Sequence, residues 1–77
     1  MTFDRITAEP GKMNGQPCIR GTRFPVKTVV RMVAGGMSVA QILAEHPDMD
    51  EEDVRQALEF AAASLDADTY LPIRHSA

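Results

Sequence analysis

Four basic side chains gather around one turn-rich stretch of this 77-residue chain. The stretch GQPCIRGTRFPV, Gly15–Val26, holds two Arg and no acidic residue, and Lys27 and Arg31 follow it. If the residues after it form a helix, Lys27 and Arg31 lie one turn apart on the same face. Arg23 precedes the start of that helix, where backbone N–H groups also attract anions. The pattern predicts an anion site for DNA phosphates at Arg20, Arg23, Lys27 and Arg31.

A structural role is an equally good interpretation of the same stretch. Glycine adopts positive φ at little cost and proline fixes a turn, so these residues can redirect the chain from a strand into a helix. The hydroxyl or guanidinium that follows can also bond to loop carbonyls or to the first helical N–H groups. The two interpretations are compatible, because a rigid turn aims its arginines. The residues predicted to build the turn are Gly15, Pro17, Gly21, Thr22 and Pro25.

Other chemistry is poorly represented in the sequence. Carboxylates cluster at Asp50–Asp53, but the cluster has no basic or metal partner nearby in sequence and fits a helix start. No order of Ser, His and Asp, no phosphate-binding loop and no metal motif can be assembled. His46 fits a helix C-terminus, and Cys18 fits a small buried residue. We therefore expect no enzyme, no cofactor, no metal and no small-molecule substrate.

The first half of the chain predicts a small β element and one helix. Phe3–Thr7 alternates apolar and polar residues as a strand does, and Pro17–Arg20 predicts a second short strand after strong turn signals. Pro25 suits a first helical position. A stripe at helical spacing then follows, and Gly35-Gly36 ends the helix. The stripe is Val26, Val29, Val30 and Val33.

The second half predicts two more helices joined by a short turn. Ser38 caps the first of them in a capping box with Gln41, with Val39, Ile42 and Leu43 on its buried side and Pro47 at its end. Asp50 caps the second, which has an inner apolar stripe. The stripe consists of Val54, Ala57, Leu58, Ala61 and Leu65. The predicted fold is mainly α: a trihelical, helix-turn-helix-like domain of the winged-helix or homeodomain-like kind, with a short N-terminal β element.

Charge divides the chain into two unlike halves. Residues 1–37 have a net charge of +4 and residues 38–77 have −7. A helix-turn-helix usually reads DNA with the start of its last helix, but that start here is Asp50–Asp53, which phosphates repel. We therefore expect any DNA contact to come from the basic N-terminal half. The alternative is a protein-interaction or structural module that does not bind DNA.

Length and composition bound the organisation further. The chain is long enough for one domain, predicted at residues 1–66, with a tail at residues 67–77. A single small core supplies little spare stability, and with one cysteine no internal disulfide can help, so we expect a homodimer or a complex. We also expect no export signal and no membrane span, and hence a cytoplasmic protein.

Two quoted stretches resemble a known family. NGQPCIRGTRFPVKTVV and GGMSVAQILAEHPDMDEEDVRQALEFA are similar to the small bacterial proteins called domain of unknown function 433, over about residues 3–65. His46 and Met49 depart mildly from the family pattern, which often has Tyr and Leu there. The resemblance implies a helix-turn-helix-like fold and a role as antitoxin of a type II toxin–antitoxin pair, beside a PIN-like ribonuclease toxin.

The tail offers a binding segment for such a toxin. It has no helical period, and its apolar residues can dock on a partner while its arginine reaches the carboxylates that a PIN-like nuclease gathers around its metal. A plain frayed terminus is the competing interpretation. The residues predicted to bind toxin are Tyr70, Leu71, Ile73 and Arg74.

Overall fold

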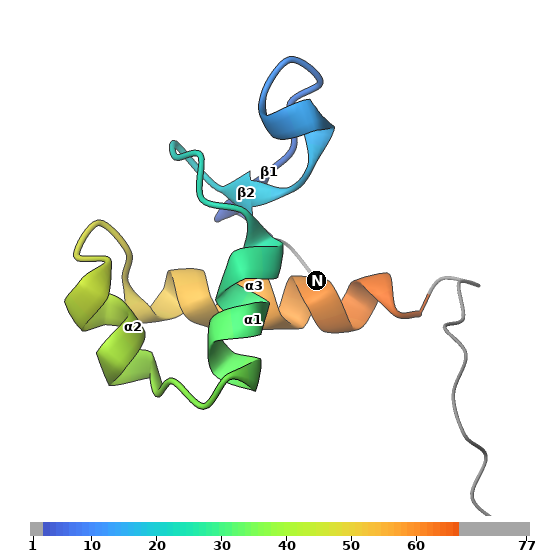
Figure 1. Ribbon diagram of the computed structural model, residues 1–77. Helices are drawn as coiled ribbons and strands as arrows, with labels where there is room; N and C mark the ends of the chain where they lie inside the picture. The colour runs from blue at the N-terminus through green and yellow to red at the C-terminus, as the bar shows by residue number, and fades with distance from the viewer. Residues whose placement is uncertain (1–2, 67–77) are drawn as a thin grey trace, which may run out of the picture.

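The computed structural model describes residues 3–66, which form a two-stranded element followed by three helices (Figure 1). The predicted mainly α, helix-turn-helix-like fold with a short N-terminal β element is confirmed. The elements are β1 (Ile6–Thr7), a short 3-10 helix η1 (Met13–Gly15), β2 (Cys18–Ile19), α1 (Val26–Ala34), α2 (Val39–Glu45) and α3 (Glu51–Ser64).

The two strands pair antiparallel, with Ile6 opposite Ile19 and Thr7 opposite Cys18. β1 is shorter than the predicted Phe3–Thr7, because the chain turns before it: the Ile6 amide donates to the Phe3 carbonyl at 3.2 Å. The Arg5 amide donates to the side chain of Gln56 in α3 at 2.9 Å. Backbone amides that would pair in a longer strand therefore bond elsewhere: that of Ile6 closes a turn, and that of Arg5 bonds to α3.

α1 begins one residue later than the proline position suggests. Pro25 is the N-cap residue, with extended backbone angles (φ −68°, ψ 145°), and Val26 is the first helical residue. The helix ends at the glycine pair as predicted: Gly36 has φ 100°, its amide donates to Val33, and the Met37 amide donates to the Met32 carbonyl at 3.1 Å. These two bonds form a Schellman motif, which satisfies the last carbonyls and turns the chain toward α2.

Capping boxes start both later helices, at the two predicted cap residues. The Gln41 amide donates to the Ser38 hydroxyl at 3.1 Å, and the Gln41 side chain accepts from the Ser38 amide at 2.8 Å. In the same way the Asp53 amide donates to Asp50 at 2.9 Å, and the Asp53 carboxylate accepts from the Asp50 amide at 3.0 Å. Both boxes satisfy amides that a helix start leaves without partners.

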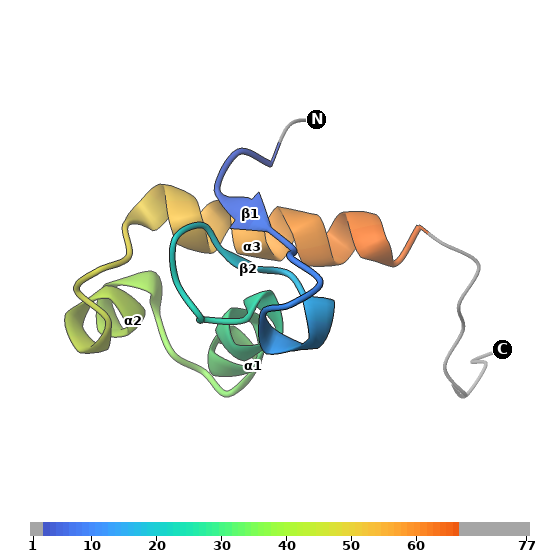
Figure 2. The same cartoon turned by 90° about the horizontal axis from the view of Figure 1, so that it is seen from above.

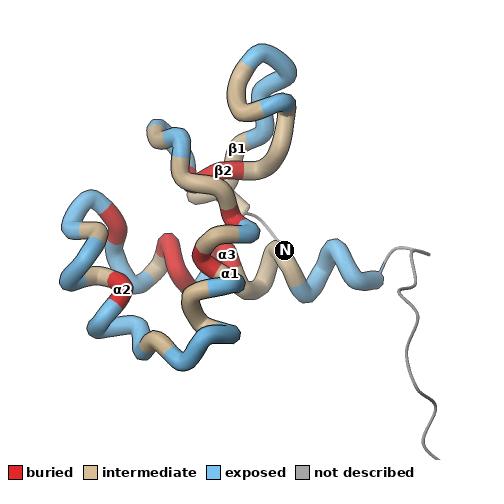
Figure 3. The backbone as a smooth tube through the Cα atoms, in the orientation of Figure 1, coloured by how far each residue is buried: buried red, intermediate tan, exposed pale blue. Residues whose placement is uncertain are grey.

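α1 packs across the middle of α3, and α2 packs against the beginning of α3 (Figures 1 and 2). Burial is concentrated where β2, α1 and the first half of α3 meet (Figure 3). None of the three helices is long and apolar enough to cross a membrane. The buried apolar core contains Ile19, Val26, Val29, Ile42, Met49, Val54 and Ala57.

Two residues predicted to be buried are exposed instead. Val39 is 37% exposed, because it begins a seven-residue helix of which only Ile42 is fully buried in the core. Leu65 is 76% exposed, because the last turn of α3 extends past α1 and the β element (Figures 1 and 2). Helical periodicity placed each of them on the apolar face, but periodicity does not say how far the neighbouring elements reach.

Candidate functional site

The loop between β2 and α1 is held by the hydroxyl of Thr22. This hydroxyl donates to the Ile19 carbonyl at 2.7 Å and accepts from the Phe24 amide at 3.0 Å. Gly21 has φ 76°, in the left-handed region where a side chain is strained. The loop is therefore a closed turn with a defined direction.

Backbone bonds at both ends tie the same loop to its neighbours. The Val26 amide donates to the Pro17 carbonyl at 3.0 Å, so the start of α1 is bonded to the start of β2. Pro25 pairs with Cys18 in an isolated β-bridge. Gly15 has φ 77° and donates to the Lys12 carbonyl at 2.9 Å, which closes the turn before β2.

The four basic residues singled out in the sequence are all exposed. None of them pairs with a carboxylate within residues 3–66. The structure divides them into two groups. Arg20 and Arg23 belong to the loop, whereas Lys27 and Arg31 lie on α1 and flank a groove between α1 and α3.

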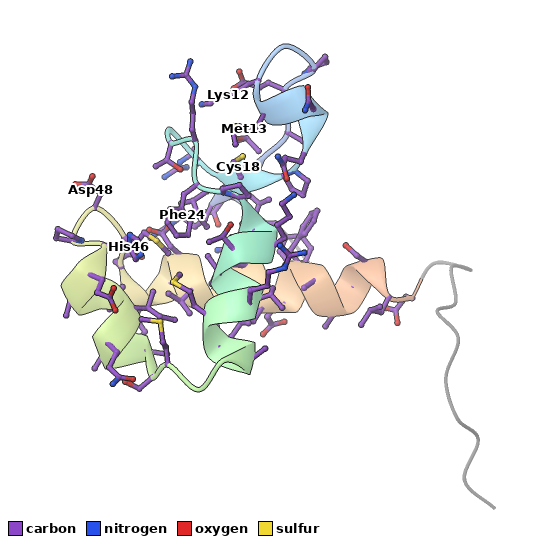
Figure 4. All side chains as sticks on the ribbon, in the orientation of Figure 1. Lys12, Met13, Cys18, Phe24, His46 and Asp48 are labelled. Atoms are coloured by element: carbon purple, nitrogen blue, oxygen red, sulfur yellow. The ribbon has the colours of Figure 1, made fainter. Side chains whose placement is uncertain are left out.

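Arg23 lines a separate hollow of about 310 Å³ beside the turn between α2 and α3. Phe24 and His46 meet edge to face in this hollow, with ring centroids 4.7 Å apart. Figure 4 shows the two side chains next to each other, near Asp48. His46 is the C-cap residue of α2, as the sequence suggests.

The acidic start of α3 has a basic partner that the sequence analysis missed. Arg5 Nη1 donates to both oxygens of Asp50 at 2.7 and 2.9 Å and to Asp53 Oδ1 at 2.9 Å. The hydrogen bond from Arg5 holds the pKa of Asp50 below its ordinary value, and these carboxylates raise the pKa of Arg5. Arg5 lies 45 positions from Asp50, so no local pattern could have revealed the pair.

A buried glutamine extends this polar network. Gln56 is 5% exposed and donates to Asp4 at 2.6 Å and to Glu52 at 2.9 Å. The Gln56 hydrogen bond is the main reason why the pKa of Asp4 lies below its ordinary value. Arg55, with a smaller contribution from Gln56, lowers the pKa of Glu52 to about 2. Most of the acidic charge at the start of α3 is thus engaged inside the domain.

The described residues offer little for metal or thiol chemistry. No three His, Cys, Asp or Glu side chains of residues 3–66 lie where they could hold one metal ion. Cys18 is 3% exposed and its thiol lies 3.5 Å from the Gln16 carbonyl, as a small buried residue would. The predicted toxin-binding residues lie outside the described residues; they are Tyr70, Leu71, Ile73 and Arg74.

Comparisons with known proteins show one family, one relative by sequence and one structure of similar fold. A family profile described as "Protein of unknown function (DUF433)" matches residues 6–61. "Uncharacterized protein y4eO" of Sinorhizobium fredii is 41% identical over 59 residues, which are 77% of this chain and 27% of that protein. The crystal structure of a DUF433 member protein from Anabaena variabilis is 32% identical with a TM-score of 0.77, and the match covers 82% of this chain and 62% of that one. The chain therefore spans only part of the length of either relative.

Proposed function

This chain belongs to the DUF433 family, and from that premise we propose that it is an antitoxin-type binding protein of the cytoplasm. Its partner is a PIN-like ribonuclease toxin, and it acts by binding rather than by catalysis. One observation carries the proposal. Arg5 and Arg55 occupy the carboxylates at the start of α3, while the cations of the loop and α1 are exposed and, within residues 3–66, pair with none.

Such an arrangement suits an anionic partner on the N-terminal side of the fold. The closed turn fixes the backbone that carries Arg20 and Arg23, so only their side chains have to be ordered when an anion binds. The opposite half of the chain is strongly acidic, which leaves it for a different partner. In this proposal the toxin contacts the C-terminal part, with Tyr70, Leu71 and Ile73 as apolar contacts and Arg74 directed to the metal-binding carboxylates of the nuclease.

Operator DNA is the second candidate, and the exposure of Arg20 and Arg23 favours it. These arginines can reach DNA phosphates from the loop without bringing the acidic start of α3 into the major groove of the DNA. Contacts of this kind position a protein on DNA but do not choose a sequence. A homodimer would present two copies of the loop and so offset the overall acidity of the chain.

Co-expression tests the antitoxin role. The full chain is expressed with the nuclease-like product of an adjacent gene, purified through a tag on the nuclease, and assayed for the nuclease activity that remains. We expect a stable complex and suppressed RNA cleavage. Deletion of residues 67–77 should weaken the complex. Failure of the parent chain to co-purify or to suppress cleavage would contradict the proposal.

A mobility shift on the promoter region of the chain's own gene tests the DNA role. Exchanging both Arg20 and Arg23 for Ala should weaken binding on every sequence, and each lost phosphate contact should reduce the log–log salt slope by about 0.9. Exchanging Glu51 and Glu52 for Gln is the matched control and should leave binding equal or stronger. The reverse pattern would make α3 the DNA reader.

A further inference from the structure

A shallow apolar groove runs between α1 and the second half of α3. It encloses about 310 Å³, and its surface is mostly apolar. Val30 contributes from α1, and Phe60 and Ala61 contribute from α3. Lys27 and Arg31 border it, and Ser64 lies at the end of α3. Ala61 has only a methyl group, which allows another backbone to come close.

Only one of the two cations suits the helix that carries them: Arg31 stands in the last turn of α1, where the helix dipole favours positive charge. Like charges at i and i+4 repel one another on a helix. Lys27 also stands in the first turn of α1, where the helix dipole disfavours positive charge, and α1 has no acidic residue in that turn. Neither cation pairs with a carboxylate within residues 3–66, and nothing in the described fold explains the position of Lys27.

We propose that this groove binds a helix of a partner protein, with an apolar side facing Val30 and Ala61 and two carboxylates one turn apart facing Lys27 and Arg31. The inference rests on the proposed binding function and adds a surface on α1 and α3 that recognises the same partner, besides the proposed C-terminal contacts. Carboxylates at i and i+4 match the spacing of the two cations, and apolar side chains match the groove between them. Charge complementarity sets the orientation of the bound helix.

Two other occupants fit less well. A second copy packed groove to groove about a two-fold axis would bring two Lys27 and two Arg31 side chains together, and like charges at an interface oppose association. A DNA phosphate would use the cations but leave the apolar side of the groove open to water. Arg20 and Arg23, which lie outside the groove, are better placed for phosphates.

Amide NMR of the full ¹⁵N-labelled chain tests the inference with three synthetic helical peptides. The peptides share one leucine face and differ only at two flanking positions, i and i+4, which are Glu, Gln or Lys. We expect the Glu peptide to shift the amides of Val30, Ala61 and Ser64 and to bind about tenfold more tightly than the Gln peptide, the size expected for two partly exposed ion pairs. The Lys peptide should bind most weakly.

Three variants separate the contributions. Lys27→Ala with Arg31→Ala should abolish the preference for Glu over Gln while weak binding of both peptides persists. Ala61→Glu should block all three peptides, because the longer side chain fills the groove and its carboxylate competes for Lys27 and Arg31. Lys12→Ala, which removes a cation outside the groove, is the control and should leave the affinity for all three peptides unchanged. Circular dichroism checks that each variant keeps its helices.

Several outcomes would overturn the inference. These are equal binding of the three peptides, no shift with any of them, or a DNA duplex that shifts the same amides and displaces the Glu peptide. Shifts of the Val30 and Ala61 amides on deletion of residues 67–77 alone would show that the chain's own tail is the occupant. If the groove variants still co-purify with the nuclease and the parent chain suppresses it, the groove inference is wrong and the antitoxin proposal stands. If the parent chain does not bind the nuclease at all, the proposed function is wrong instead.

Discussion

At the scale of single residues, Arg5 and Gln56 attach the N-terminal element to α3. Arg5 bonds through its side chain to Asp50 and Asp53 and through its amide to Gln56. The carboxylates that it reaches also form the capping box of α3. One arginine therefore fixes both the position of the β element and the start of the longest helix.

Replacing Arg5 by Ala should lower the melting temperature clearly. The Asp53 side chain is 10% exposed, and removal of the guanidinium leaves it buried without its cation. Arg5→Lys should recover part of the loss by restoring the charge. Arg55→Ala is the control: its partners Glu52 and Glu59 are each 38% exposed, so a smaller fall is expected. Circular dichroism measures the melting temperatures. This account would be contradicted if Arg5→Ala and Arg55→Ala lowered the melting temperature equally.

Acid should destabilise the domain, in part through Glu52. Its pKa is 4.5 ordinarily and about 2 in the folded protein, mainly because of Arg55. Between these values the unfolded chain binds more protons than the folded one, so stability falls as the pH falls from 4.5 toward 2. Asp4 and Asp50 act in the same direction. Urea unfolding across this pH range measures the slope, which Glu52→Gln should flatten; an unchanged slope would assign the effect to other carboxylates.

At the scale of elements, capping residues decide where a helix begins and ends, whereas packing decides how much of it is buried. Both capping boxes and the glycine pair after α1 follow from short-range residue choices. How much of each helix is buried depends on the neighbours that it meets. α2 shows the difference, because Ile42 is fully buried and Val39, on the same predicted face, is 37% exposed.

Paired substitutions in α2 should therefore have unequal effects. Ile42→Ala is expected to reduce the free energy of unfolding by about 2–5 kcal/mol, because it removes a fully buried side chain and leaves a cavity. The whole domain has only about 4–12 kcal/mol available at this length, so the variant is close to unfolding. Val39→Ala should change the free energy by less than about 0.5 kcal/mol. Urea melts would contradict the burial pattern if the two losses were similar.

At the scale of the whole molecule, the end of α3 is exposed. Ala62, Ala63 and Leu65 are exposed there, and Figure 3 shows the exposed end extending away from the buried centre. A hollow of about 550 Å³ lies along it, bordered by Phe3 and Ala63. The exposed apolar side chains at this end, with Glu59 and Asp66 bordering the same hollow, offer a contact surface for another chain.

The isolated chain is therefore expected to be a dimer or larger at micromolar concentration. A small core and an exposed, alanine-rich helix end both favour association. Leu65→Glu should shift the population toward monomer, whereas Val39→Glu, on α2, should not. Sedimentation velocity measures both. A clean monomer for the parent chain at this concentration would refute the expectation.

The sequence alone determined the features that depend on neighbouring residues. The helix starts at Ser38 and Asp50, the stop at Gly35-Gly36, the turn before α1 and the mainly α fold all follow from local backbone preferences and helical periodicity. The tertiary structure decided what depends on distant residues: Arg5 meets Asp50 across 45 positions, Lys27 and Arg31 border a groove that needs Phe60 and Ala61, and Leu65 is left uncovered. Local preferences act over a few residues, whereas these contacts exist only when the packing of α1, α3 and the β element brings distant side chains together.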